Sequence, residues 1–449
     1  MARGHPHWIS VVIAAALVLG CESVAERSIM PVPVGALTIL FSADNQGVLS
    51  SCGCPTNPSG GFAKRQTLID KFRRVRQDVV VVDAGDMFPD RPNPVKVKYL
   101  ATALGRAQYD AIAMGDQDFL LGVADIQKLA AEHKLPLISA NVRDEAGNLL
   151  FPPHVIREAG GRRIGIFAVI ADQTFDNPPR EWRKGLKVEP PIEAARREVR
   201  ALAGCDLVIA LSHQPIAATQ ELAKNVPGID IVVSGHDDAI FRKPLAVGKT
   251  MILAVGPVGR MLGSLTLSKG VSVATAPAAA MELHSLSEKL VRDAPWVLDL
   301  YWEYVRKARG EAPPVWALGV LPPKYEPAEA CIRCHQNEYR NWQTTLHAHA
   351  YLTIKEKGRQ EDPECILCHT MGYGRANGFY SMEETPELGR VTCQACHPLA
   401  SDHAEKKIKT DPRRDINART CLHCHGLIES PDFDFYTYKP KIAHPPTEP

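Results

Sequence analysis

Val79-Val80-Val81-Val82-Asp83-Ala84-Gly85-Asp86 is the stretch that says most about the fold of this 449-residue chain. A nearly pure valine run is typical of a strand buried on both faces. Similar strands are expected at 36–41, 111–114, 137–140, 163–169, 207–211 and 229–234, and helical patterns fall between them at 95–108, 123–133, 191–203 and 217–225. This alternation predicts a layered α/β domain over residues 35–268.

The composition excludes several classes of protein. Lysine plus arginine is 52 and aspartate plus glutamate is 51, so the formal net charge is +1. That balance argues against a nucleic-acid binder that works through bulk positive charge. After the N-terminal segment no apolar run reaches the roughly 20 residues that a bilayer-spanning helix needs. The hydrophobic content of 45% is enough for a sizeable core, which excludes a disordered chain.

Residues 1–21 have the pattern of an export signal. A basic start at Met1-Ala2-Arg3 precedes a short apolar stretch from Trp8 to Leu19. Such a pattern is typical of a secretory signal and is too short for a stable membrane helix. The end, Val18-Leu19-Gly20-Cys21, resembles a bacterial lipobox, which implies a lipid anchor on Cys21. The alternative is ordinary cleavage beside an incidental cysteine, and both predict an exported protein on the periplasmic side of a bacterial membrane.

Four copies of the pattern C-x-x-C-H dominate the last third of the chain. They are Cys331-Ile332-Arg333-Cys334-His335, Cys365-Ile366-Leu367-Cys368-His369, Cys393-Gln394-Ala395-Cys396-His397 and Cys421-Leu422-His423-Cys424-His425. The composition predicts only about 0.01 such matches by chance. The repetition is therefore not accidental.

This spacing suits covalent attachment of c-type haem. Two thiols form thioethers with the vinyl groups of one porphyrin, and the adjacent histidine binds the iron. Zinc also uses C-x-x-C pairs, and exported proteins use disulfides, but neither requires a histidine after every pair. The sequence thus predicts four haems, with the proximal ligands His335, His369, His397 and His425.

The second axial ligands come from the other histidines of this region. His349 stands two residues from His347, so on a helix the two face different directions and only one is expected to bind iron. His423 lies inside an attachment loop and is a poor candidate. The remaining candidates are His347, His403 and His444. Three bis-histidine haems are therefore expected, and a fourth whose sixth position is uncertain and is a candidate open site for a small molecule.

This region resembles the tetrahaem cytochrome c-554 family. The resemblance lies in Trp342-Gln343-Thr344-Thr345-Leu346-His347 after the first motif, in Asp402-His403 and in the closing Lys441-Ile442-Ala443-His444. It implies a mainly α, loop-rich domain over residues 325–449 with closely packed haems that pass single electrons. It also implies that one iron lacks a sixth ligand.

Polar clusters at the strand ends resemble the 5′-nucleotidase branch of the calcineurin-like metallophosphoesterases. They are Ala43-Asp44-Asn45-Gln46-Gly47, Ala84-Gly85-Asp86, Gly115-Asp116-Gln117-Asp118, Ser212-His213-Gln214 and Ser234-Gly235-His236-Asp237-Asp238. The resemblance implies two packed sheets with two divalent metals between them, which activate water to attack phosphorus. The implied site residues are Asp44, Asp86, Asp116, His213 and His236.

Three histidines of the family pattern are missing from this chain. The family has histidine where Gln46, Gln117 and Asp238 stand. A glutamine cannot protonate a leaving group, so hydrolysis is expected to be weak. Carboxylates and amides still suit a hard metal such as manganese, magnesium or calcium, so the domain is a candidate to bind one or two divalent ions. The alternative is a scaffold whose remaining polar residues bond only to one another.

Two further features leave their roles open. Cys52-Gly53-Cys54 lies near the predicted metal site and suits a metal ligand, a strained disulfide, a redox pair or a purely structural role. Cys205 is expected to be a small buried residue. Residues 269–324 are interpreted as a linker with a bridging helix at 285–309, whose expected role is a packing brace between the domains.

The leading interpretation is an exported, lipid-anchored tetrahaem cytochrome that carries electrons. Its expected partners are redox proteins or quinol-linked donors and a membrane, not a nucleic acid. One alternative is a metal-dependent phosphoesterase or nucleotidase with an accessory cytochrome. Another is a redox enzyme that acts on a small molecule at an open haem.

Overall fold

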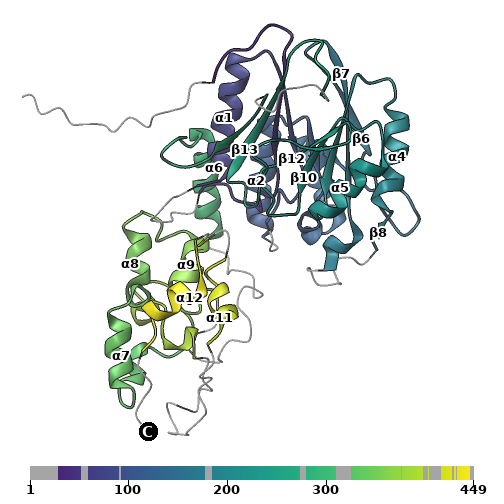
Figure 1. The fold of residues 1–449 in the computed structure, drawn as a ribbon. Coiled ribbons are helices and arrows are strands. Elements are labelled where there is room, and N and C mark those ends of the chain that lie inside the picture. Colours follow the sequence, from purple (N-terminus) through teal and green to yellow (C-terminus); the bar gives the residue numbers. More distant parts are fainter. Residues whose placement is uncertain are drawn as a thin grey trace, which may run out of the picture.

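The computed structural model describes residues 29–51, 59–89, 93–176, 185–273, 280–309, 325–375, 377–397, 403, 416–426, 429–430 and 432–444. These residues form an α/β sandwich followed by a helical, loop-rich part, which Figure 1 shows on one side of the sandwich. The predicted fold class is confirmed. The lipobox cysteine and the pair Cys52 and Cys54 lie outside the described residues.

The first sheet has six strands in the order β14-β13-β1-β2-β3-β4. Its strands are β1 (Leu37–Ser42), β2 (Asp78–Asp83), β3 (Ala111–Ala113), β4 (Leu137–Ile138), β13 (Met261–Leu267) and β14 (Met281–Ser285). From β1 to β4 neighbouring strands are parallel, while β13 and β14 pair antiparallel. The carboxyl ends of β1, β2 and β3 therefore meet at one edge of the sheet.

The second sheet has six strands in the order β11-β12-β10-β9-β7-β6. Its strands are β6 (His154–Ala159), β7 (Arg162–Ile170), β9 (Leu207–His213), β10 (Ile231–Gly235), β11 (Leu245–Val247) and β12 (Thr250–Ala254). The four inner strands are parallel and the two edge strands are antiparallel. A separate small pair joins β5 (Val142–Arg143) to β8 (Lys187–Val188).

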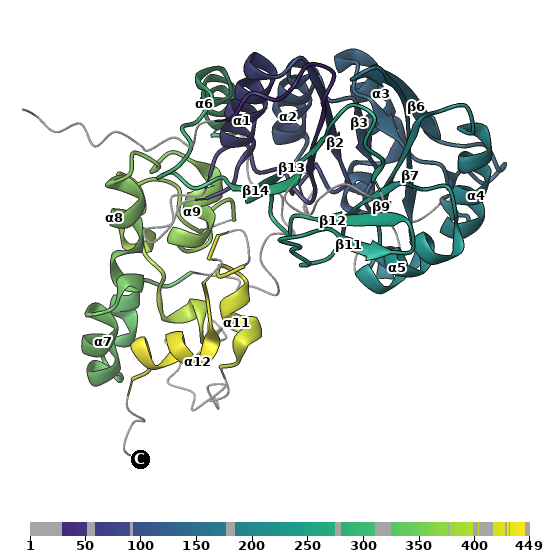
Figure 2. The same cartoon turned by 45° about the horizontal axis from the view of Figure 1, so that its top comes forward.

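Helices cover the outer face of each sheet, as Figure 2 shows. On the first sheet these are α1 (Phe62–Val75), α2 (Pro94–Ala107) and α3 (Val123–His133), and α6 (Pro295–Ala308) packs against α1 and α2. On the second sheet they are α4 (Pro191–Ala201) and α5 (Ile216–Asn225). The result is a four-layered sandwich with the two sheets at its centre.

The valine run is continuous because its residues face two different cores. Val80 and Val82 pack into the cluster between the two sheets, and Val81 packs into the cluster beneath the helices. Leu40 on β1 likewise faces the helices, while Ile39 faces the other sheet. Successive side chains of a strand point to opposite faces, so a strand with apolar layers on both sides needs apolar residues throughout.

The segment between the two parts differs from its prediction. Helix α6 begins only at Pro295 instead of residue 285, and the segment before it contains the strand β14 (Met281–Ser285), which the sequence did not predict. Both elements belong to the α/β domain, because β14 pairs with β13 and Tyr301 and Tyr304 of α6 are buried in its core. These two elements, which the sequence analysis assigned to the linker, thus pack with the sandwich. Proline suits the first turn of a helix, which explains the later start.

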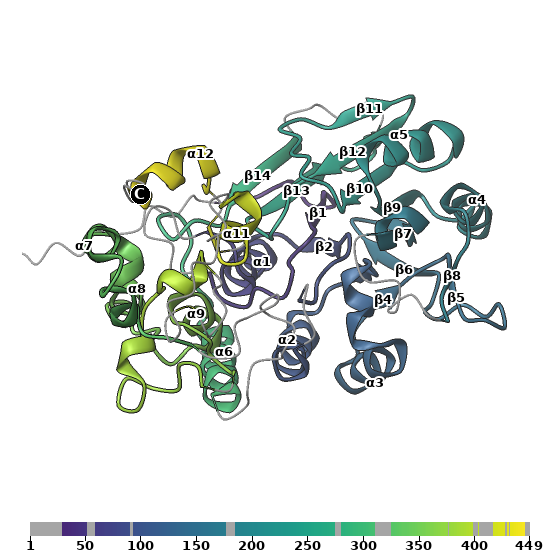
Figure 3. The same ribbon diagram turned by 90° about the horizontal axis from the view of Figure 1, so that it is seen from below.

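The C-terminal part is built from short helices. They are α7 (Gln336–Gln343), α8 (Ala350–Lys355), α9 (Pro363–His369), α11 (Ala418–Leu422) and α12 (Phe435–Tyr438). In the described residues its apolar cluster consists of Tyr325, Ile354, Ile366, Met371, Phe379 and Leu388. Figure 3 shows α9 beside α6, where the two parts of the chain meet. Within the described residues, no helix combines the length and the apolar character needed to cross a membrane.

Candidate metal centre and histidine pairs

The two sheets bring their polar strand ends together at one edge of the sandwich. Asp44, Asp86 and Asp116 follow β1, β2 and β3, while His213 ends β9 and His236 follows β10. Ligands of parallel α/β sheets commonly bind outside the carboxyl ends of the strands. The topology thus places all five residues implied by the resemblance at one edge.

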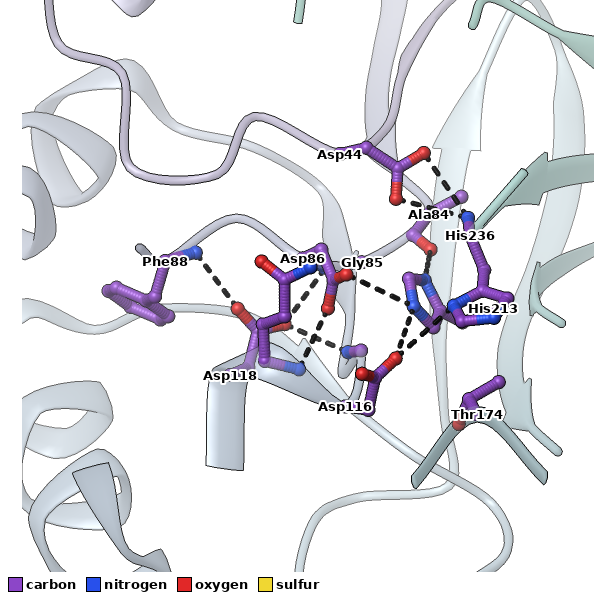
Figure 4. A network of polar contacts seen from close by, with 12 residues as sticks. Asp44, Ala84, Gly85, Asp86, Phe88, Asp116, Asp118, Thr174, His213 and His236 are labelled. Atoms are coloured by element: carbon purple, nitrogen blue, oxygen red, sulfur yellow. Dashed lines mark hydrogen bonds and ion pairs between the residues drawn. The ribbon is translucent and has the colours of Figure 1, made fainter. Parts of the chain in front are cut away.

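Four of these five side chains form a compact cluster. Asp86, Asp116, His213 and His236 each offer a ligand atom, and these atoms lie within 4.8 Å of one another. His213 Nε2 lies 3.1 Å from Asp116 Oδ1 and 3.5 Å from Asp86 Oδ2. His236 Nδ1 lies 3.3 Å from the same Asp116 oxygen. Figure 4 shows the four side chains pointing toward a common centre. Two imidazoles and two carboxylates are a suitable donor set for a divalent transition metal.

The electrostatics of the cluster favour charged side chains. Burial opposes the ionised form of Asp116, but hydrogen bonds to His213 and His236 lower its pKa to about 2. Burial likewise opposes a charge on His213, but the neighbouring carboxylates of Asp86 and Asp116 raise its pKa well above the ordinary value. The ionised carboxylates thus make this position favourable for a cation. Without a metal, the proton of the charged His213 ring balances part of their negative charge.

A backbone contact sets the orientation of His213. Its Nδ1 lies 2.9 Å from the carbonyl oxygen of Ala84, just after β2. Nδ1 donates to this carbonyl, so Nε2, which faces the cluster, is the atom that would lose its proton and offer a lone pair to a bound metal. The contact therefore selects the tautomer that a metal ligand requires.

Asp118 shapes the loops around the cluster instead of joining it. Its carboxylate accepts hydrogen bonds from the backbone N–H groups of Asp86, Phe88 and Gly115, at 3.1, 2.9 and 2.8 Å. Burial and the nearby charge of Asp86 raise the pKa of Asp118 to about 8. The sequence singled out this residue only as part of a motif, and its role as a tie between two loops depends on the fold.

The loops that carry the site have an uncommon backbone. Asp44, Gln46, Asp86 and His236 have positive φ angles of 51, 51, 53 and 69°. Non-glycine residues rarely adopt this left-handed region, and functional sites are where such conformations concentrate. At Asp86 it coincides with a hydrogen bond from Gln117 N–H to Asp86 Oδ1 at 3.0 Å. The turns therefore hold the carboxylates in place without a metal.

The remaining positions of the family pattern do not join the cluster. Both carboxylate oxygens of Asp44 accept the backbone N–H of His236, at 3.0 and 3.2 Å. Burial raises the pKa of Asp44 well above its ordinary value. Asp238 is exposed, and Gln46 is half-buried. The described residues thus bring four possible ligands together at one place, in the cluster of Asp86, Asp116, His213 and His236.

Two buried amide groups near the cluster lack hydrogen-bond partners in the described part of the chain. They are Gln117 Oε1 and Gln214 Nε2. Unpaired buried polar atoms are uncommon in proteins and call for a water, an ion or a ligand. Sequence reasoning also missed Asp237, whose carboxylate accepts the first N–H of α5, from Ile216, at 2.7 Å. Asp237 stands 21 residues after Ile216 in the chain, so this contact depends on the fold and no local pattern could have identified it.

In the C-terminal part, each C-x-x-C-H motif forms one helical turn. The histidine N–H donates to the carbonyl of the first cysteine in three motifs, at 2.9 Å for His335, 2.8 Å for His397 and 2.9 Å for His425. The motif of His369 lies within α9. A single turn puts the two thiols on one face, where one porphyrin can reach both. The eight motif cysteines form no disulfide with one another.

Three pairs of histidine rings face one another at similar distances. The ring centres of His335 and His403 are 6.2 Å apart, those of His347 and His425 are 6.1 Å apart, and those of His397 and His444 are 5.9 Å apart. Two imidazoles that bind one metal from opposite sides, with metal–nitrogen distances of about 2 Å, hold their ring centres roughly 6 Å apart. The spacing therefore fits an iron ion between the rings.

His369 differs from the other three motif histidines. Among the described residues, no ring contact links it to another histidine. Its Nδ1 lies 2.8 Å from the carbonyl oxygen of Ala350 and 3.1 Å from the hydroxyl of Thr353. These contacts fix the ring and leave Nε2 for a metal. His349, the histidine set aside in favour of His347, is exposed and contacts the Gln343 carbonyl at 3.1 Å.

Two family models match the chain in separate regions. Residues 37–238 match calcineurin-like phosphoesterase, and residues 330–398 match cytochrome c554 and c-prime. The 5′-nucleotidase of Homo sapiens is 28% identical over 249 residues, which are 50% of this chain and 43% of that protein. A snake venom 5′-nucleotidase of Crotalus adamanteus is 29% identical over 194 residues, 40% of this chain and 32% of the relative. The chain thus spans less than half the length of these curated relatives.

Solved structures share the fold of the sandwich. A sulfate thiohydrolase SoxB of Thermus thermophilus in complex with glycerol has a TM-score of 0.55 and 19% identity, covering 64% of this chain and 63% of that one. A 5′-nucleotidase precursor of Thermus thermophilus has a TM-score of 0.52 and 19% identity, covering 72% and 68%. At this identity the likeness establishes the fold of the N-terminal part and no more.

Proposed function

We propose that the main function of this protein is electron transfer through four covalently bound haems. The chain joins a calcineurin-like phosphoesterase domain of the 5′-nucleotidase type to a cytochrome c554 domain. The observation that carries this proposal is the set of three histidine ring pairs, each with a motif histidine and a ring spacing of 5.9 to 6.2 Å.

The ring pairs suggest which residues would hold each haem. His335 with His403, His347 with His425, and His397 with His444 would supply two axial ligands each. The cysteines that would attach the porphyrins are Cys331 and Cys334, Cys365 and Cys368, Cys393 and Cys396, and Cys421 and Cys424. When bound, haem iron with two such ligands supplies reversible one-electron chemistry.

The polypeptide prepares these histidines to bind metal. Burial and the neighbouring His425 and His369 lower the pKa of His347 to about 4, so that its ring is neutral at physiological pH. Burial, with the charge of His444, also lowers the pKa of His397. A neutral imidazole keeps the lone pair that a metal requires.

The N-terminal segment supports a proposal about the location and partners of the protein. The first 21 residues have the pattern of an export signal that ends in a lipidated cysteine. Export would place the haem motifs outside the cytoplasm and near a membrane. There, redox proteins or quinol-linked enzymes would supply and accept the electrons.

The decisive test is a cofactor count on the purified, processed protein. Expression in a host equipped for cytochrome maturation is expected to give four haems per chain by pyridine haemochrome absorbance and a matching mass increase. Reduced spectra should show mainly low-spin haem. An unmodified polypeptide from such a host would refute the proposal.

A phosphoesterase is the second candidate, because the cluster of Asp86, Asp116, His213 and His236 is compatible with a divalent cation. Such a cation would act as a Lewis acid and would lower the pKa of a bound water. Yet Gln117 stands where the family has the histidine that protonates the leaving group, and an amide has no proton to give. We therefore expect metal in this domain with little turnover. Metal analysis and assays with nucleotides and phosphodiesters distinguish this candidate.

A redox enzyme is the third candidate, because His369 has no ring partner among the described histidines. A haem held by one histidine leaves a position at which a small molecule can bind. Carbon monoxide or nitric oxide should then change the spectrum of about one haem in four in the reduced protein. Complete indifference to both gases would exclude this candidate.

A further inference from the structure

A buried carboxylate stands between the two parts of the chain, beside one of the haem-attachment cysteines. Asp362 is fully buried and caps the start of α9, where its Oδ1 accepts the Glu364 N–H at 3.0 Å. Its other oxygen, Oδ2, lies 3.4 Å from Cys365 Sγ. This charged group therefore touches the sulfur that would carry a porphyrin.

The α/β domain supplies one partner of that carboxylate. Tyr301 of α6, which is also buried, donates its hydroxyl hydrogen bond to Asp362 Oδ2. Arg359 forms an ion pair with the same oxygen at 3.2 Å, and its guanidinium lies 4.8 Å from the centre of the Tyr301 ring. The charge state of Asp362 thus depends on a residue from the other domain.

A second set of contacts fixes the same turn of α9. Tyr304 of α6 donates to Glu364 Oε1 at 2.9 Å, and Lys96 of α2 forms an ion pair with that oxygen at 2.7 Å. Asn93, the cap of α2, donates to the Tyr304 hydroxyl at 3.2 Å. The turn therefore has two carboxylates opposite two cations, Asp362 and Glu364 opposite Arg359 and Lys96, so its charge is balanced.

This joint lies at one particular haem motif. Helix α9 carries Cys365, Cys368 and His369, the one motif whose histidine shows no ring partner in the described residues. A haem there is the candidate for an open coordination position. The phosphoesterase-like domain thus supports the haem site that differs from the other three.

We propose that Asp362, held by Tyr301 of the α/β domain, is a positioning residue that sets the reduction potential of the haem attached at Cys365 and Cys368. This inference rests on the proposed haem attachment. The oxidised iron carries one more positive charge than the reduced iron, so a nearby carboxylate stabilises the oxidised form. Burial strengthens that interaction, because the low dielectric of the interior screens charge less than water does.

The test is a spectroelectrochemical titration of the full-length, haem-loaded protein at pH 8. Asp362→Asn removes the charge and leaves Arg359 uncompensated, so one of the four haem transitions should shift to a more positive potential. The shifted transition should be that of the high-spin haem. The matched control is Glu361→Gln, which removes a charge from the neighbouring residue, an exposed partner of Arg309. It should leave all four transitions in place.

A second variant keeps the test informative if Asp362→Asn does not fold. Tyr301→Phe keeps the carboxyl group but removes its hydroxyl donor, so the same transition should shift while the other three stay in place. Unchanged potentials in these variants, or an equal shift of all four haems, would overturn the inference. A wild-type protein without haem would instead refute the proposed function, so the two failures are distinguishable.

Discussion

In the α/β domain, the candidate metal ligands stand at the ends of strands whose neighbours are buried in large apolar clusters. In the C-terminal part, the histidine pairs are supported by short helices and one small cluster. The first site is held by the polypeptide, whereas in its described part the second region has one cluster of six buried residues to support eight attachment cysteines and seven ligand histidines. From this comparison we infer that the polypeptide alone holds the first site in shape, and that bound haem would stabilise the fold of the second region.

The strongest test of this comparison removes the haems. Replacing the eight motif cysteines with alanine should prevent haem attachment and leave the C-terminal part unfolded, because its core then lacks the porphyrins. The α/β domain should keep a cooperative thermal transition. Limited proteolysis followed by mass spectrometry measures both effects. Cys205→Ala is the control, and a protease-resistant C-terminal part in the haem-free variant would contradict the comparison.

The buried ion pair of Arg65 and Asp83 tests the rigidity of the α/β domain. Its two charged atoms lie 3.4 Å apart, and both side chains are fully buried. Asp83→Ala leaves a buried cation without its partner, which should lower the free energy of unfolding by about 3–5 kcal/mol. Haem absorbance should not change. Glu193→Ala, which breaks an exposed pair with Arg196, should have a much smaller effect in the same urea titration.

The metal ligands provide a sharper test within that domain. His213→Ala should weaken binding of Mn²⁺ or Zn²⁺ by more than the roughly 10–100-fold that loss of an outer-shell contact costs. Asp238→Ala should leave binding unchanged, because this exposed side chain does not join the cluster. Isothermal titration calorimetry on the chelator-treated protein compares the two. Equal losses in both variants would show that the metal lies elsewhere.

The smallest expected effect concerns acid stability at the surface of the α/β domain. Burial opposes ionisation of Glu189, but hydrogen bonds and charges from Arg197 and Arg143 lower its pKa below the ordinary value. A carboxyl group whose pKa is lower in the folded than in the unfolded state stabilises the fold at pH values above its unfolded-state pKa. This stabilisation is lost as the pH falls through the folded-state pKa.

Glu189→Gln should therefore cost about 1 kcal/mol or less at pH 7 and nothing below both pKa values. Thermal melts of the α/β transition from pH 7 to 3 measure this difference. A cost that persists unchanged at pH 3 would show that the effect is not electrostatic. The matched variant Glu193→Gln should show a smaller dependence, since its pair is more exposed.

The sequence predicted the parts of the fold that depend on local pattern. The valine run and its neighbours are strands at the expected places, because burial on both faces requires continuous apolar residues. The cluster residues could be expected at one edge because parallel strands end together. Helix α6 was predicted too long, since helical spacing alone did not distinguish 285–294 from the helix that follows.

Other features depend on contacts between distant residues. Which histidine faces which, as in His335 with His403, is decided by how loops approach one another and not by spacing along the chain. The turn of Asp44 toward the His236 backbone is set by left-handed conformations that no pattern in the sequence specifies. The position of Asp362 beside Cys365 and Tyr301 likewise arises only when the two parts of the chain meet.

The left-handed turns at Asp44, Gln46, Asp86 and His236 affect which substitutions these loops can accept. Because hydrogen bonds within the protein maintain these turns, a neighbouring side chain can be replaced without loss of the loop conformation. The backbone of these loops can therefore stay the same while the side chains that they present differ. Histidine at Gln46, Gln117 and Asp238, where the family has it, would meet loops whose shape is already set.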